Sequence, residues 1–142
     1  MIILDTNVVS EPLRPEPDQA VIDWLNAQEP QTLYLTAVNL AEMLAGVQAI
    51  SAGRRRDALM QAMHGQMFPL FEGRILPFDN KAAEAFAQTN TGARVNGNTI
   101  SFADCAIAAI ARTHGFTVAT RNVRDFRGTG VEVINPWTFT RK

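Results

Sequence analysis

Apolar and polar positions contrast most sharply at the start of the chain, where four apolar residues, 1–4, run directly into Asp5, Thr6 and Asn7. An uninterrupted apolar run of this kind favours a strand buried on both faces, as in a parallel sheet. Open α/β folds bind their ligands at the carboxyl ends of such strands. A carboxylate there is costly to desolvate without a cation or hydrogen-bond donors, so Asp5 is a candidate functional residue. The alternative is that Asp5 and Asn7 only cap the next turn.

Short β-rich segments then alternate with segments of helical periodicity. We expect further strands at 32–35, 74–78, 116–120 and 131–134. We expect helices from Asp18 to 25, at 37–52, from 54 to about 68, at 81–91 and from Ser101 to about 115. The proline-rich stretch 8–17 and the polar stretch 90–99 are predicted to be irregular loops. A basic pair, Arg141-Lys142, ends the chain.

This alternation predicts an α/β fold, a three-layer α/β/α sandwich with a mainly parallel central sheet. The 142 residues are the length of one ordinary domain, so a single domain over 1–142 is expected. Right-handed crossovers would bring the carboxyl ends of the first and fourth strands to the same edge of the sheet.

Composition narrows the class of protein. The net charge of -1 predicts that any nucleic-acid binding depends on a local basic patch. The single Cys105 excludes an intramolecular disulfide and suits a reducing compartment. No apolar run approaches the roughly 18 residues that a membrane span needs, and the N-terminus lacks a basic signal-peptide region. We therefore expect a cytoplasmic protein with no membrane contact.

Acidic residues from distant segments are predicted to meet at the sheet edge. Asp5 follows the first strand, Glu42 lies in the helix after the second, and Asp104 begins the helix that leads to the fourth. Asn122 and Asp125 follow the fourth strand. Glu42 could instead be a solvent-facing residue near a helix start, and Asp104 could serve only a Ser-x-x-Asp cap.

Clustered carboxylates repel each other unless they take up protons or share a cation. Mg²⁺ or Mn²⁺ prefers oxygen ligands, and such an ion can activate water against a phosphate ester. The sequence contains no phosphate-binding glycine loop. His64 and His114 lack the context of a hydrolase triad, and Cys105 is expected to be a small buried residue.

Several motifs together resemble the PIN-domain nucleases, within them the VapC toxins, and most closely the FitB-like branch. The resemblance rests on 4–7, Ala41-Glu42, 102–104 with 107–109, and 119–126, and for the branch on 11–15, 73–79 and 135–137.

The resemblance implies a Mg²⁺- or Mn²⁺-dependent endoribonuclease, the toxin of a type II toxin–antitoxin pair. Asp5, Glu42 and Asp104 match the principal acids of the family, with Asp5 and Asp104 as metal ligands and Glu42 completing the shell or orienting water. The family places an acid directly after the fourth strand, where this chain has Asn122. We interpret Asp125 as an outer-shell acid and Asn122 as an oxygen ligand or water-positioning group.

Other roles follow from the same resemblance. Thr6, Asn7 and Thr120 are expected to support the acids, and the candidate RNA contacts are Arg121, Arg124, Arg54 and Arg55. The expected partners are a VapB-like antitoxin, an RNA substrate such as transfer RNA, and operator DNA only indirectly through the antitoxin. A homodimer is expected, with the methionine-bearing helix after Gly53 as its candidate surface.

Three alternatives compete with this interpretation. A haloacid-dehalogenase-like phosphatase needs Asp-x-Asp after the first strand, and the second acid is replaced here by Asn7. A catalytically weak partner could instead act mainly with a DNA-binding antitoxin as a transcriptional regulator. A receiver domain needs paired early acids and a late strand-end lysine, which this chain lacks.

Overall fold

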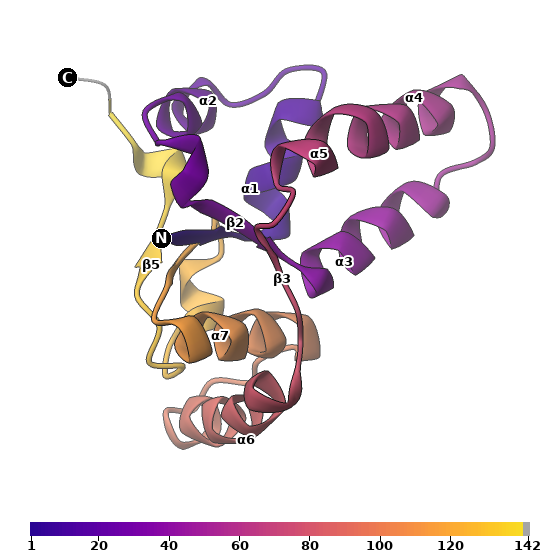
Figure 1. The fold of residues 1–142 in the computed structure, drawn as a ribbon. Coiled ribbons are helices and arrows are strands. Elements are labelled where there is room, and N and C mark those ends of the chain that lie inside the picture. Colours follow the sequence, from indigo (N-terminus) through magenta and orange to yellow (C-terminus); the bar gives the residue numbers. More distant parts are fainter. Residues whose placement is uncertain (141–142) are drawn as a thin grey trace.

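The protein is built around a five-stranded sheet in the order β3-β2-β1-β4-β5, as the computed structural model of residues 1–140 shows (Figure 1). Each of the four strand pairings described is parallel. The strands are β1 (Ile2–Leu4), β2 (Leu33–Thr36), β3 (Ile75–Leu76), β4 (Thr117–Ala119) and β5 (Val133–Ile134). The predicted fold class is therefore confirmed.

The register of the central strands sets the position of the acids. Leu4 of β1 pairs with Ala119 of β4, and the Asp5 amide donates to the Ala119 carbonyl at 2.8 Å. Ile3 and Leu4 are buried on opposite faces of the sheet, as their uninterrupted apolar run predicted. Asp5 therefore lies beside the end of β4, at the edge where the sequence predicted ligand binding.

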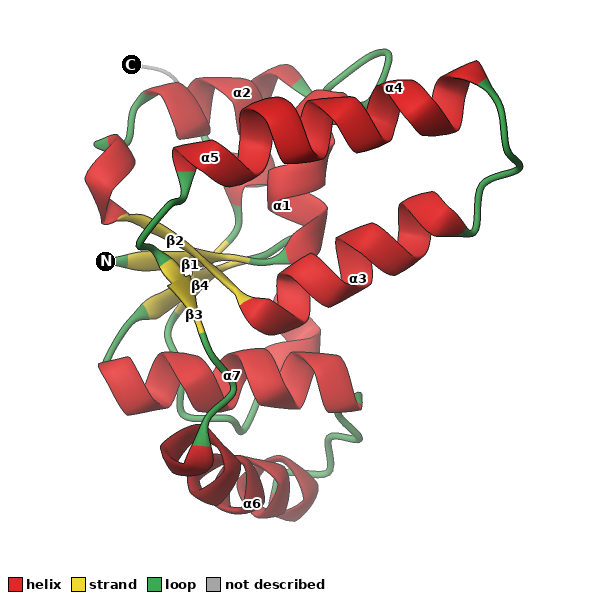
Figure 2. Cartoon of the chain, turned by 45° about the vertical axis from the view of Figure 1, so that its right-hand side comes forward, coloured by secondary structure: helices red, strands yellow, loops and turns green. Residues whose placement is uncertain are grey.

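Helices cover both faces of the sheet (Figures 1 and 2). One face is covered by α7, with α6 packed on its outer side, and the other by α1, α2 and α5, while α3 and α4 extend as an arm. The helices are α1 (Thr6–Ser10), α2 (Gln19–Asn26), α3 (Ala37–Gln48), α4 (Arg54–Ala62), α5 (Phe68–Leu70), α6 (Asn80–Val95) and α7 (Phe102–His114). Within residues 1–140, no helix is long and apolar enough to cross a membrane.

The prediction that 8–17 is an irregular loop was wrong in its first half. Asp5 caps α1 by accepting from the Thr6 amide, and the 3₁₀ turn η1 (Glu11–Leu13) follows with Pro12 in its first turn. Proline is tolerated there because the first helical amides have no internal partner. The prolines therefore mark the end of a helical segment.

Two predicted helix boundaries were also displaced. Helix α3 ends at Gln48, four residues before the expected position, whereas α6 continues to Val95 through the stretch expected to be a loop. Gly92 within this extension has a packing role: a Cβ there would lie 2.9 Å from the Gly128 carbonyl oxygen, so the close approach of the neighbouring loop requires glycine.

The methionine-bearing helix is not the exposed surface that the sequence suggested. Its regular part ends at Ala62, and a π-helical turn, η3 (Met63–Met67), turns both methionines into the core, where Met63 is completely buried. Met63 and Met67 therefore pack within one chain and do not form an exposed stripe, and the assignment of this helix to a dimer surface stays a prediction. The basic pair at 141–142 lies outside the described residues.

Candidate active site

Asp5 is the innermost acid of the site. Its side chain is only 4% exposed, and its Oδ1 accepts from the Thr6 amide at 2.8 Å. Its Oδ2 accepts from the Thr120 hydroxyl at 2.8 Å and from the Asn7 side-chain amide at 3.4 Å. The capping role that was the alternative for Asp5 is real, but capping occupies only one of the two carboxylate oxygens.

The loop after β4 is fastened to the same group of residues. The Asn7 Oδ1 accepts from the Arg121 amide at 3.2 Å, and the Thr120 hydroxyl oxygen accepts from the Asn122 amide at 3.0 Å. Thr120 is completely buried, so its hydroxyl has one fixed role as donor to Asp5 and one as acceptor from the loop. The ends of β1 and β4 are thereby joined through side chains as well as through the sheet.

Glu42 approaches the site from α3 and is exposed. Its Oε1 accepts from the Thr6 hydroxyl at 2.8 Å, and that hydroxyl oxygen accepts from the Asn39 side-chain amide at 3.0 Å. Asn39 is buried and forms a reciprocal capping box with Thr36 at the start of α3. This chain of hydrogen bonds fixes Glu42 relative to Asp5, since Thr6 contacts both groups.

Asp104 lies in the first turn of α7, and its amide donates to the Ser101 hydroxyl at 3.1 Å. Ser101 is therefore the cap of this helix, as predicted, and the Asp104 carboxylate is half-buried. Asp125 lies in the 3₁₀ turn η4 (Val123–Phe126) and is exposed. The Asn98 side chain holds this turn by donating to the Asp125 carbonyl at 3.1 Å.

The four acids influence one another electrostatically. Burial raises the pKa of Asp5, the hydrogen bond from Thr120 opposes that rise, and the charges of Glu42 and Asp125 add to it. Burial, with the Asp5 charge next in size, raises the pKa of Asp104 from 3.8 to about 6. The acids are therefore close enough to repel, although within residues 1–140 no group of three or more His, Cys, Asp or Glu side chains is arranged so that it could hold a metal ion.

The predicted arginine contacts divide into two groups. Arg121 and Arg124 are exposed on the loop after β4, and Arg54 and Arg55 are exposed at the start of α4. Arg55 lines a groove of about 960 Å³ between α1, α3 and α4, with Thr6 and Glu42 at its edge. Arg54 is not among the residues that line this groove.

Two residues around the acids were missed by sequence reasoning. Asn39 was overlooked although Thr36-x-x-Asn39 has the spacing of a capping box, a signal that was available. Trp137 was noted only as part of a motif, and nothing in the local sequence indicates that its ring lies against Arg121, at 5.2 Å from Cζ to the ring centroid.

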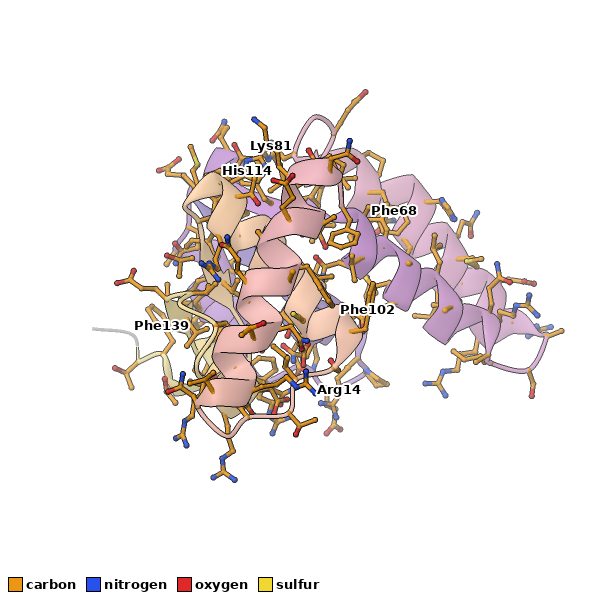
Figure 3. The ribbon with its side chains drawn as sticks, turned by 90° about the horizontal axis from the view of Figure 1, so that it is seen from below. Arg14, Phe68, Lys81, Phe102, His114 and Phe139 are labelled. Carbon is orange, nitrogen blue, oxygen red and sulfur yellow. The ribbon has the colours of Figure 1, made fainter. Side chains whose placement is uncertain are left out.

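An apolar hollow of about 460 Å³ lies on the other side of Glu42. It is lined by Ala37, Val38, Ala41, Ala45, Phe102 and Ala103 besides Glu42 itself. Phe102 begins α7 and lies on the side of α3 (Figure 3); its side chain is 65% exposed although Phe78 and Phe86 pack against it. Glu42 therefore borders an uncovered apolar face.

Comparison with known proteins shows what the whole chain is similar to. A family model described as the PIN domain matches residues 2–131. The chain is 45% identical over 137 residues to the VapC ribonuclease Y4jK of Sinorhizobium fredii, covering 96% of this chain and 98% of that protein. It is 44% identical to the toxin FitB of Neisseria gonorrhoeae, with 96% and 99% covered. The solved structure of FitAB bound to the IR36 DNA fragment superposes with a TM-score of 0.94 at 44% identity, covering 99% of each chain.

Proposed function

This chain belongs to the PIN-domain family, and we propose that it is a metal-dependent endoribonuclease that acts as the toxin of a VapBC-like toxin–antitoxin pair. The observation that carries the proposal is that Asp5, at the end of β1, shares its electrostatic environment with Asp104 of α7, Glu42 of α3 and Asp125 of the turn after β4. This arrangement occurs in a chain that is 45% identical to a VapC ribonuclease.

A divalent cation fits the chemistry of these residues. Asp5 is buried with a raised pKa, and its neighbours are acids rather than cations, so the charge of the site is uncompensated. Mg²⁺ usually binds through one or two carboxylates and retains several waters, which suits acids that approach without closing a cage. We assign Asp5 and Asp104 as the ligands of Mg²⁺ or Mn²⁺. When bound, the ion supplies positive charge for the phosphoryl transition state and lowers the pKa of an attacking water.

The chain's own residues orient these groups. The Thr120 hydroxyl and the Asn7 side chain fix Oδ2 of Asp5. The Thr6 hydroxyl fixes Glu42 at the exposed side of the site, where its free oxygen can orient a water molecule. The Asn7 side chain donates to Asp5 and accepts from the Arg121 amide, so it joins Asp5 to the loop after β4. This disfavours the phosphatase alternative, which needs an acid at position 7.

The proposed partners are an antitoxin and, through it, operator DNA. The FitAB structure bound to a DNA fragment supports this arrangement, since this chain matches one chain of that structure over 99% of its length. A bound antitoxin would neutralise the nuclease.

We also retain a homodimer but assign it to the apolar face of Phe102 and α3. A two-fold interface brings one surface into contact with itself, and this face offers both an exposed ring and a shallow hollow beside it. Phe102→Asp is expected to shift the protein from dimer to monomer in light scattering. If Phe102→Asp remains a dimer, the face of Phe102 and α3 is not the dimer interface.

Metal-titrated cleavage of single-stranded RNA tests the enzymatic proposal. Purified wild-type protein is expected to cut RNA with Mg²⁺ or Mn²⁺, to stop when the metal is chelated, and to arrest growth when expressed without an antitoxin. Sequencing of RNA ends after expression would identify the substrate. A protein that binds its antitoxin and operator but never cleaves RNA would favour the regulatory alternative.

A further inference from the structure

Trp137 follows β5, the strand that pairs with β4 where the loop of the acid site begins. Ala119 of β4 pairs with Ile134 of β5, and the Thr120 amide donates to the Ile134 carbonyl at 2.9 Å. The chain then enters the 3₁₀ turn η5 (Pro136–Thr138), which the Asn135 side chain caps by accepting from the Trp137 amide at 2.9 Å. The indole is half-buried and packs on the core from one side. The position of the indole is therefore fixed by packing against the core and by the capped turn that holds its backbone.

Arg121 is fixed at both of its ends. Its amide donates to Asn7, whose side chain contacts Asp5, so the backbone of Arg121 is attached to the acid site. Its guanidinium lies over the Trp137 ring with Cζ 5.2 Å from the centroid. A flexible exposed arginine loses side-chain entropy when it binds a ligand, and stacking on a fixed ring removes part of that loss in advance.

Stacking leaves the hydrogen-bonding edge of the guanidinium available. The planar group has five donors, which lie in its plane and match two oxygens of a phosphate. Within residues 1–140 the one ion pair joins Arg14 to Glu11, so no described carboxylate neutralises Arg121. Phosphodiester groups are therefore the ligand class that suits this arginine.

We propose that Trp137 is a positioning residue that holds Arg121 to bind a backbone phosphate of RNA next to the acids. This inference rests on the proposed nuclease function and adds to it a substrate contact and the residue that orients the contact. Trp137 acts through Arg121 and does not touch the reacting atoms.

Kinetics of Trp137→Leu and Trp137→Phe test the role. Trp137→Leu removes an exposed cation–π contact and is expected to raise KM roughly two- to fivefold with kcat almost unchanged, and Trp137→Phe is expected to restore most of the loss. If the contact to one phosphate is lost, the salt dependence of log kcat/KM should weaken by about 0.7 per decade of salt for single-stranded RNA. Arg121→Gln should give the same two changes, and the double variant no more than Arg121→Gln alone.

The chain offers a matched control in its second arginine–aromatic pair. Arg74 lies over Phe71 with Cζ 5.7 Å from the ring centroid, at the opposite edge of the sheet beside β3. Phe71→Leu removes a comparable stack from a buried position and should lower the melting temperature without changing KM or salt dependence. Equal kinetic changes in this control would mean that general destabilisation, not positioning, explains Trp137→Leu.

Binding of a non-cleavable RNA, measured by fluorescence anisotropy, separates this inference from the nuclease proposal. The same series of variants should weaken binding by the same factors, whether or not the wild type cleaves. Additive losses from Trp137→Leu and Arg121→Gln, or a fall in kcat at constant KM and unchanged binding, would overturn the positioning role.

Discussion

The inner and outer parts of the acid site differ in how they are held. Asp5 at the inner edge is buried and receives donors from Thr6, Asn7 and Thr120. Asp125 at the rim is exposed on a 3₁₀ turn and influences the inner acids only through its charge. One region is fixed before any ligand arrives, whereas the other remains solvated.

This difference predicts that functional sensitivity falls from the inside outward. A buried carboxylate in a fixed hydrogen-bond set contributes its full charge at low local dielectric, while water screens an exposed one. The same logic places Glu42 between the two extremes, because it is exposed but anchored by the Thr6 hydroxyl.

Asp5→Asn is expected to have the largest effect. Losing the charge of a metal ligand removes several kcal/mol of transition-state stabilisation, which corresponds to roughly a thousandfold or greater loss of kcat/KM. The fold should survive, since an asparagine can still cap α1 and no longer buries a charge. RNA cleavage and thermal unfolding, measured on the same preparation, check both parts. Retention of even a tenth of wild-type activity would show that Asp5 is not an essential ligand.

Acidification is expected to have the next largest effect. Protonation of Asp104, whose pKa is raised to about 6, should lower cleavage about tenfold per pH unit below that value when metal is limiting. Without metal, stability should move the opposite way. Because the folded pKa lies above 3.8, the contribution of Asp104 is fully present below pH 3.8 and is lost as pH rises through about 6.

Cleavage rates, and thermal melts recorded with a metal chelator present, should be measured between pH 4.5 and 7. They would test the predicted fall in activity and the predicted rise in metal-free stability on acidification. Asp104→Asn is the control, because it removes the titrating carboxyl and should abolish the part of the pH dependence of stability that Asp104 contributes. A cleavage profile that stays level from pH 7 to 5 would contradict the assignment of Asp104.

The sequence predicted the inner region better than the rim, and the reason is physical. The apolar run that ends on Asp5 indicates both the strand and the ligand position, because burial on two faces requires an uninterrupted apolar run that is visible in the local sequence. The contacts of Glu42 and Arg121 depend instead on Thr6 of α1 and Trp137 of η5, which lie on other elements. Such contacts arise from strand register and helix entry angles, which no local pattern specifies. The loop predicted at 8–17 was wrong for a similar reason. Asp5 caps helix α1 there, and the prolines that follow suggested irregular structure instead.

Thr120→Val, compared with Thr6→Val, tests how the two kinds of acid are supported. Thr120 is buried and bonded to Asp5, so losing its hydroxyl should destabilise the fold by about 1–3 kcal/mol and lower cleavage by about tenfold. Thr6→Val removes the hydroxyl that donates to exposed Glu42 and accepts from Asn39. It should lower cleavage only about threefold, since water competes for an exposed carboxylate and the net contribution of that bond is less than about 1 kcal/mol. Equal effects in paired rate and stability measurements would remove the distinction between inner and outer support.

Asp125→Asn is expected to have the smallest effect and gives the sharpest test of the rim. Its charge is a minor cause of the raised pKa values of Asp5 and Asp104, so its removal should shift the acidic limb of the rate profile to lower pH. At neutral pH the rate should change by less than about threefold, because water screens an exposed charge. Asn122→Ala is the companion variant, since Asn122 contributes its backbone amide to Thr120 and that bond is retained. A hundredfold loss in Asp125→Asn would instead make Asp125 a direct ligand, drawn inward only when metal and RNA are bound.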